Sequence, residues 1–122
     1  MTKIVLWVSD LDAQTSFYME LLDAVVGEES DGFRQLISNR SEILLHELPE
    51  PYKLPVPLTQ ATPAQEEVAI KPVFPLISIE AAMQRVKSSL AVFAKETTVF
   101  AGQLYQDVID PEGNVIQLEQ QQ

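Results

Sequence analysis

The chain has 122 residues, of which 46% are hydrophobic and 21% charged, and it contains no cysteine. This length and composition predict one ordinary globular domain, and the missing cysteines exclude disulfides and thiolate metal sites. The net charge of −10, from 18 acidic and 8 basic residues, disfavours nucleic acid and anionic membranes as partners.

The sequence predicts neither a membrane span nor a secretory leader. No apolar run approaches the roughly 18 residues that a spanning helix requires. The first ten residues, MTKIVLWVSD, reach Asp10 too early for a leader's apolar region and lack a small-residue cleavage site. We therefore expect a cytoplasmic location.

The first half of the chain predicts one strand, one helix and three further strands. Residues 3–9 are apolar and β-rich, and Asp10 is placed to cap a helix over residues 11–23. Strands follow over 24–29, 33–38 and 42–48, with turn residues between them. Alternation along the first strand separates two faces: Ile4, Leu6 and Val8 on one, and Lys3, Val5, Trp7 and Ser9 on the other.

Residues 49–69 separate the two halves of the chain. They contain five of the eight prolines, which excludes a helix or a central strand. We expect an extended linker that is partly polyproline II.

The second half repeats the order of elements. Residues 70–78 predict an edge strand, because Pro72 and Pro75 interrupt an apolar run. A helix over 79–90 and strands over 92–100, 103–109 and 114–120 follow, with a tight turn at Gly113-Asn114. The chain therefore predicts two βαβββ modules, residues 1–48 and 70–120, packed as one domain because neither module buries its own sheet face.

Two segments carry a resemblance to a known family. VSDLDAQTSFY, entering the first helix, and DPEGNVIQLE, near the C-terminus, resemble the glyoxalase/bleomycin-resistance/extradiol-dioxygenase (vicinal oxygen chelate) superfamily. The resemblance implies an α+β fold in which two βαβββ modules form a half-open, eight-stranded cup with helices outside and ligand within. It also implies a homodimer. Asp23, where the family often has glycine, and the two prolines of residues 70–78 depart from its pattern.

The resemblance also indicates where metal ligands would stand in metal-dependent members. The four corresponding positions are Lys3, Leu44, Lys71 and Gln117. A protonated lysine and a leucine offer no lone pair, so only Gln117 could ligate. A shift of one residue introduces Glu42, His46 or Glu119 without giving three good ligands. We expect no metal and no cofactor.

Several cup-facing residues have more than one interpretation. Lys3 and Lys71 pair with Glu42, Glu119 or Asp107, bind an anionic ligand group, or point to solvent. His46 is a hydrogen-bonding or acid–base group, or a half-exposed residue at a strand end. Trp7 and Tyr105 stack on a planar ligand, or pack in the core or a dimer interface. The predicted ligand-binding residues are Lys3, Val5, Trp7, Leu44, His46, Lys71, Val73, Tyr105 and Gln117, with no catalytic residue among them.

The sequence leaves three classes of function open. The first is a metal-free small-molecule binding protein, similar to the drug-sequestering branch of the family, which takes an aromatic or cationic ligand in the cup. The second is an enzyme: a metal-dependent lyase, isomerase or dioxygenase, or a metal-free relative that uses lysine and His46. The third is a structural dimer with a vestigial site.

Overall fold

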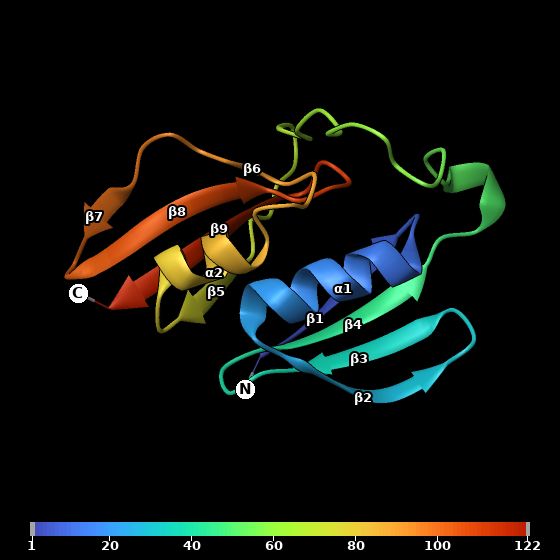
Figure 1. The fold of residues 1–122 in the computed structure, drawn as a ribbon, viewed down its shortest axis with the longest axis horizontal. Coiled ribbons are helices and arrows are strands. Elements are labelled where there is room, and N and C mark those ends of the chain that lie inside the picture. The colour runs from blue at the N-terminus through green and yellow to red at the C-terminus, as the bar shows by residue number, and fades with distance from the viewer. Residues whose placement is uncertain (1, 122) are drawn as a thin grey trace. The chain divides into compact units, whose positions relative to one another are not determined.

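The structure of the protein is a computed structural model that describes residues 2–121. The chain divides into two compact units, Met1–Thr59 and Gln60–Gln122. Each unit contains one sheet and one α-helix (Figure 1), and we call them the first and second modules.

The first module is a four-stranded sheet with one helix. Its strands lie in the order β1-β4-β3-β2, with β1 parallel to β4 and the other neighbours antiparallel. The helix α1 contacts β3 and β4, and the side chains of Tyr18, Leu21, Leu36, Ile43 and Leu45 are buried. Each such buried side chain stabilises the fold by about 1.5–3 kcal/mol relative to an exposed one. The elements are β1 (Lys3–Val8), α1 (Leu11–Leu22), β2 (Val25–Ser30), β3 (Phe33–Ile37) and β4 (Glu42–Glu47).

Both ends of α1 follow from the residues that flank it. Asp10 has extended backbone, and its Oδ1 accepts a hydrogen bond from the Ala13 amide at 3.0 Å, which is the predicted N-cap. At the other end Asp23 adopts the left-handed conformation, with φ 52° and ψ 51°. The structure therefore places Asp23 in the backbone conformation that glycine adopts most easily.

Residues 48–72, which connect β4 to β5, are mostly irregular, as their prolines indicate. They nevertheless contain a short 3-10 helix, η1 (Glu50–Tyr52). The expectation that residues 49–69 hold no helix was wrong at this turn, because Pro51 stands at the start of η1, where the missing N–H costs no internal bond.

The second module is a five-stranded sheet with one helix. Its strands lie in the order β5-β9-β8-β6, and β7 also pairs with β8. β5 is parallel to β9, whereas β8 is antiparallel to β6, β7 and β9. The elements are β5 (Val73–Leu76), α2 (Ile79–Arg85), β6 (Val92–Phe93), β7 (Thr98–Phe100), β8 (Gln103–Ile109) and β9 (Val115–Gln121).

Three elements of the second module are shorter than predicted. The strand expected over 70–78 is β5 (Val73–Leu76). The single strand expected over 92–100 is two strands, β6 and β7, separated by residues 94–97, so residues 2–121 contain nine strands rather than eight. The helix expected over 79–90 ends at Arg85. Beyond it the Ser89 hydroxyl donates to the Val86 carbonyl at 2.7 Å, since serine competes with the helical bonding pattern.

The register of the strands supports the internal repeat. Val5 lies opposite Leu44 in the first module, and Val73 lies opposite Gln117 in the second. Lys3 and Lys71 each stand two residues before the paired valine. Lys71 therefore precedes β5 rather than lying on it, although it keeps the position equivalent to Lys3.

The turn DPEGN is fixed by the carboxylate of Asp110. Its Oδ1 accepts from the amides of Glu112 at 2.8 Å and Asn114 at 2.9 Å, and its Oδ2 accepts from the Asn114 side chain. Gly113 has φ 88°, a conformation that favours glycine. The turn therefore sets the direction in which β9 leaves, and with it the position of Gln117.

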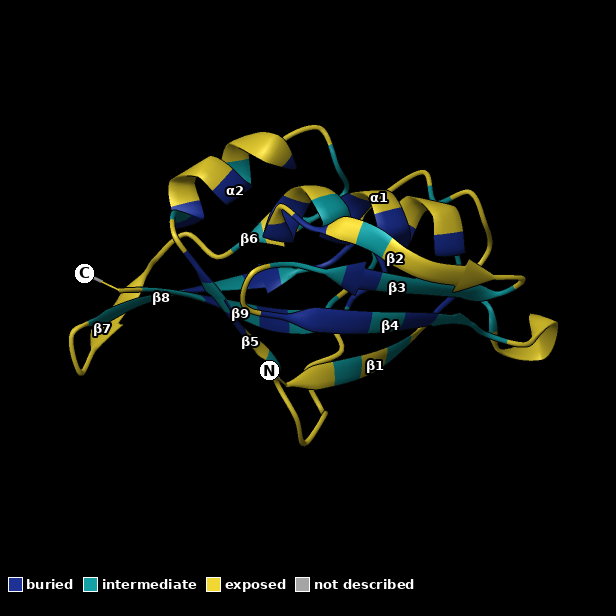
Figure 2. Ribbon diagram, turned by 90° about the horizontal axis from the view of Figure 1, so that it is seen from below, coloured by how far each residue is buried: buried dark blue, intermediate teal, exposed yellow. Residues whose placement is uncertain are grey.

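Exposure alternates along β1 (Figure 2), and in β4 Ile43 and Leu45 are buried whereas Leu44 and His46 are half-buried. In β8 the side chains of Gln106 and Val108 are buried and their neighbours are half-buried. Each sheet therefore has a buried face and a less buried face, which we call the open face. Neither α-helix among residues 2–121 combines the length and apolar character needed to cross a membrane.

Candidate ligand-binding site

The open face of the first sheet carries the predicted residues of the first module. Lys3, Val5 and Trp7 lie on β1, opposite Glu42, Leu44 and His46 on β4. Val5 and Trp7 are 53% and 54% exposed. Strand alternation therefore grouped Lys3, Val5 and Trp7 on one face of the sheet, as the structure has them.

Three rings form a row across this face. The ring centroids of Trp7 and His46 are 4.8 Å apart, and those of Phe33 and His46 are 5.0 Å apart. Phe33, His46 and Trp7 lie on adjacent strands at matching register positions, and we call them the aromatic row. The imidazole of His46 is thus packed between two aromatic side chains, and the sequence alone gave no reason to include Phe33.

Lys3 belongs to an ion pair on the same face. Its Nζ lies 3.5 Å from Oε2 of Glu42, and the side chain of Gln35 donates to that oxygen at 3.1 Å. Of the alternatives open for Lys3, the structure shows pairing with Glu42. The lysine side chain is 62% exposed, so the pair contributes little to stability.

The open face of the second sheet carries two cross-strand polar pairs. Asp107 and Gln117 are register partners, and the Gln117 amide donates to Oδ1 of Asp107 at 3.0 Å. One row further along, the Tyr105 hydroxyl donates to Oε2 of Glu119 at 2.8 Å. This hydrogen bond is the larger cause of a raised pKa at Tyr105, because ionisation would remove the proton that Glu119 accepts. Desolvation of the hydroxyl is the second cause, and it acts in the same direction.

Lys71 joins the Asp107–Gln117 pair from outside the sheet. Its Nζ lies 3.1 Å from Oδ2 of Asp107, with side-chain exposures of 43% for Lys71 and 40% for Asp107. Lys71, Asp107 and Gln117, which we call the polar triad, therefore share one carboxylate.

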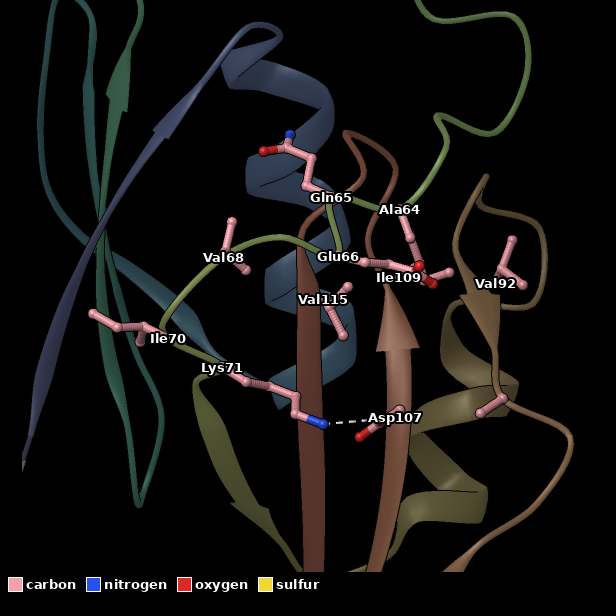
Figure 3. Close-up of a pocket in the computed structure, with 11 residues that line it drawn as sticks. Ala64, Gln65, Glu66, Val68, Ile70, Lys71, Val92, Asp107, Ile109 and Val115 are labelled. Carbon is pink, nitrogen blue, oxygen red and sulfur yellow. Dashed lines mark hydrogen bonds and ion pairs between the residues drawn. The ribbon is translucent and has the colours of Figure 1, made fainter.

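A pocket of about 320 Å³ opens beside the polar triad (Figure 3). One wall is the segment 64–71, and the others come from β6, β8 and β9. The segment is anchored by the Gln65 amide, which donates to the Gly113 carbonyl at 2.8 Å, and by the Pro72 carbonyl, which accepts from the Gln117 amide at 2.9 Å. The pocket is lined by Ala64, Gln65, Glu66, Val68, Ile70, Lys71, Val92, Ala94, Asp107, Ile109 and Val115.

Among the predicted residues of the second module, only Lys71 lines this pocket. Gln117 does not line the pocket, but its side chain donates a hydrogen bond to Asp107, which does. Val73 and Tyr105 are on strands of the same sheet but not in the pocket lining. Sequence reasoning missed Val68, because residues 49–69 were interpreted as a linker. It missed Ile70 because that residue was assigned to the strand expected over residues 70–78 and not to the site.

Comparison with known proteins shows the fold. No protein-family model and no curated protein sequence matches the chain. A glyoxalase/bleomycin resistance protein/dioxygenase family enzyme from Burkholderia phytofirmans superposes with a TM-score of 0.69 at 17% identity, over 97% of this chain and 95% of that one. The chain has the glyoxalase/bleomycin-resistance fold.

Two further structures with this fold have names that describe different functions. A bleomycin resistance determinant encoded on the transposon Tn5 has a TM-score of 0.67 and 16% identity, over 100% of this chain and 98% of that one. The fosfomycin resistance protein FosX from Listeria monocytogenes, in complex with Mn(II) and sulfate, has a TM-score of 0.70 and 17% identity, over 100% and 90%. At such identities the likeness establishes the fold alone, and function must be argued from this chain's residues.

The residues of this chain do not fit the metal centre that some members of the fold hold. Lys3 and Lys71 are ammonium groups in ion pairs, and Leu44 has no donor atom. The Gln117 amide donates to Asp107, which leaves one carbonyl oxygen as a neutral donor. Within residues 2–121, no group of three or more histidine, cysteine, aspartate or glutamate side chains is placed to hold a metal ion.

Proposed function

We propose that the protein is a metal-free small-molecule binding protein whose ligand occupies the pocket of the second module. The observation that carries this proposal is the pocket's combination of an apolar wall with one polar corner. Ligand sites in proteins are concave and mostly apolar, with a few placed polar groups that orient the ligand. The aliphatic side chains of Val68, Ile70, Val92, Ile109 and Val115 form such a wall, and Lys71 with Asp107 forms such a corner.

The shape and chemistry of the pocket favour a planar, largely apolar ligand. Five branched aliphatic side chains offer flat apolar contact without hydrogen-bonding demands. The volume of about 320 Å³ lies at the lower end of the range for ligand sites. A single ring or a fused pair of rings suits these walls better than a large polar molecule.

The charge of the lining favours a cationic group on that ligand. Lys71 and Asp107 neutralise one another, and Glu66 adds a further negative charge. The chain as a whole carries a net charge of −10, which accelerates the approach of cations more than it strengthens their binding.

A thermal-shift screen of planar aromatic cations and aromatic carboxylates tests this proposal. A ligand that binds the native state at one hundred times its Kd stabilises it by about 2.7 kcal/mol. We expect hits among the cations. The variant Ile70→Asn should weaken each hit about five- to tenfold, because it removes apolar contact from the pocket wall.

Ile77→Asn is the matched control for this variant. Ile77 is 80% exposed and Ile70 is 77% exposed, but only Ile70 lines the pocket. A screen without hits, or hits that Ile70→Asn and Ile77→Asn weaken equally, contradicts the proposed site.

The donor chemistry predicts that the purified protein retains no divalent metal. Lys3, Leu44 and Lys71 supply no lone pair, and one glutamine oxygen is too weak a ligand by itself. Elemental analysis after dialysis should find Zn, Fe, Ni and Mn well below one atom per chain. A stoichiometric metal that Gln117→Ala removes would refute this expectation.

A further inference from the structure

We propose that Lys71 is an internal placeholder cation, which neutralises Asp107 until the cationic group of a ligand replaces it. This inference rests on the proposed function and specifies how the pocket selects its ligand. It makes Asp107 the recognition residue and Lys71 a competitor of the ligand. That assignment is the opposite of the simplest one, in which a lysine at the edge of a pocket binds an anion.

Asp107 is held in position independently of Lys71. It lies on β8, and the Gln117 side chain on β9 donates to its Oδ1 at 3.0 Å. An ionised carboxylate only accepts hydrogen bonds, so this contact also fixes which end of the Gln117 amide faces Asp107. The carboxylate therefore remains oriented when its second oxygen, Oδ2, loses its partner.

Lys71 is held much less firmly. Among the described residues Asp107 is its one ion-pair partner, at 3.1 Å. Both side chains are about two-fifths exposed, and exposed ion pairs of this kind change an equilibrium by a factor of about five at most. The lysine has a flexible four-carbon stem, so its ammonium can move into solvent while the Pro72 carbonyl keeps its bond to Gln117.

An amidinium or guanidinium group is better suited to Asp107 than the lysine is. Such planar groups donate two parallel hydrogen bonds to one carboxylate, whereas an ammonium acts as a point charge. The adjoining aliphatic wall contacts the ring to which the cation is attached. Once Lys71 has left, Asp107 and Glu66 give this part of the lining a negative charge that excludes an aromatic carboxylate.

Benzamidine and benzoate are matched probes for this exchange, since they are similar in shape and opposite in charge. Binding is measured by NMR titration at constant ionic strength, from the amide signals of Ile109 and Val115 and the side-chain signals of Lys71. The proteins are wild type, Lys71→Met and Asp107→Asn. Lys87→Met and Glu96→Gln are controls, because they make the same changes in net charge at exposed residues outside the pocket.

We expect benzamidine to bind wild type and to shift the Lys71 signals towards those of a solvated lysine. Lys71→Met should bind it about three- to fivefold more tightly, since the competitor is gone, and Asp107→Asn should lose at least tenfold. The two controls should match wild type within about twofold, and benzoate should leave the pocket signals unchanged.

The placeholder role is overturned if Lys71→Met leaves benzamidine binding unchanged or weakens it. It is equally overturned if benzoate binds wild type and is lost in Lys71→Met, or if benzamidine shifts no pocket signal in either protein. None of these results touches the broader proposal of ligand binding, which fails only if the thermal-shift screen gives no ligand that depends on Ile70.

Discussion

Gly113 has a left-handed backbone conformation and lies close to the backbone of Pro63, and each of these disfavours a side chain. Its φ is 88°, and a Cβ built there would lie 2.5 Å from the Pro63 carbonyl oxygen. Gly113→Ala should therefore lower the free energy of unfolding by about 2–3 kcal/mol, from backbone strain and a displaced wall segment together. Urea denaturation monitored by circular dichroism measures this loss.

Gly102 provides the matched control for Gly113. It has φ 77°, but a Cβ there would meet no atom within 4 Å. Gly102→Ala should cost about 1 kcal/mol, from the backbone alone. Equal losses in the two variants would show that the contact with Pro63 has no energetic effect.

Asp23 is a residue whose type does not suit its backbone. It ends α1 in the left-handed conformation and places a negative charge at the negative end of the helix dipole. Asp23→Gly should raise the free energy of unfolding by about 0.5–1 kcal/mol, because it relieves both penalties. Asp23→Asn should raise it by a few tenths, since it removes the charge alone.

Thermal denaturation of these two variants and of Asp23→Ala tests the explanation. Alanine removes the charge but lacks the short polar side chain by which asparagine supports the left-handed conformation at φ 52°, so the alanine variant should be less stable than the asparagine variant. If Asp23→Ala were the most stable of the three, the backbone would not be the source of the penalty.

The aromatic row extends over three strands of the first module and offers a surface on which a planar ligand can stack. Trp7 is half exposed, lies against His46, and is the single tryptophan of the chain. The sequence-based prediction that an aromatic ligand binds beside Trp7 remains a prediction. If an aromatic ligand binds there, tryptophan emission should change on binding. The Trp7→Ala variant should bind the same ligand about three- to tenfold more weakly.

Phe100→Ala is the control for this measurement. Phe100 is 71% exposed and lies on β7, in the second module. A ligand that leaves Trp7 emission unchanged and keeps full affinity in Trp7→Ala does not use the aromatic row.

At the scale of the whole molecule, the exposed strands predict self-association. β1 and β5 lie at the ends of their sheets, and Val5, Trp7 and Val73 on them are exposed. Unpaired edges and exposed apolar side chains favour coverage by a partner. We expect a homodimer, with a mass by light scattering at micromolar concentration of about twice 13.6 kDa. A monomeric mass at that concentration would contradict this.

The sequence by itself determined the features that depend on neighbouring residues. The strand at Lys3–Val8, the cap at Asp10 and the turn at Gly113 were predicted from local patterns and have the expected conformations. The period of two along a strand also assigned Lys3, Val5 and Trp7 to one face, since alternation is a property of the extended chain. These patterns predicted the order of elements that occurs twice, and the family resemblance supplied the fold class.

Only the tertiary structure decided what these side chains meet. Lys71 and Asp107 are 36 residues apart in the sequence, and they pair because segment 64–71 and β8 both lie beside β9. Prolines indicated that residues 49–69 would be mostly irregular, but they could not show that the end of this segment forms a pocket wall. That position is set by the bonds from Gln65 to Gly113 and from Gln117 to Pro72, which join residues distant in the chain and so leave no periodic signal in the sequence.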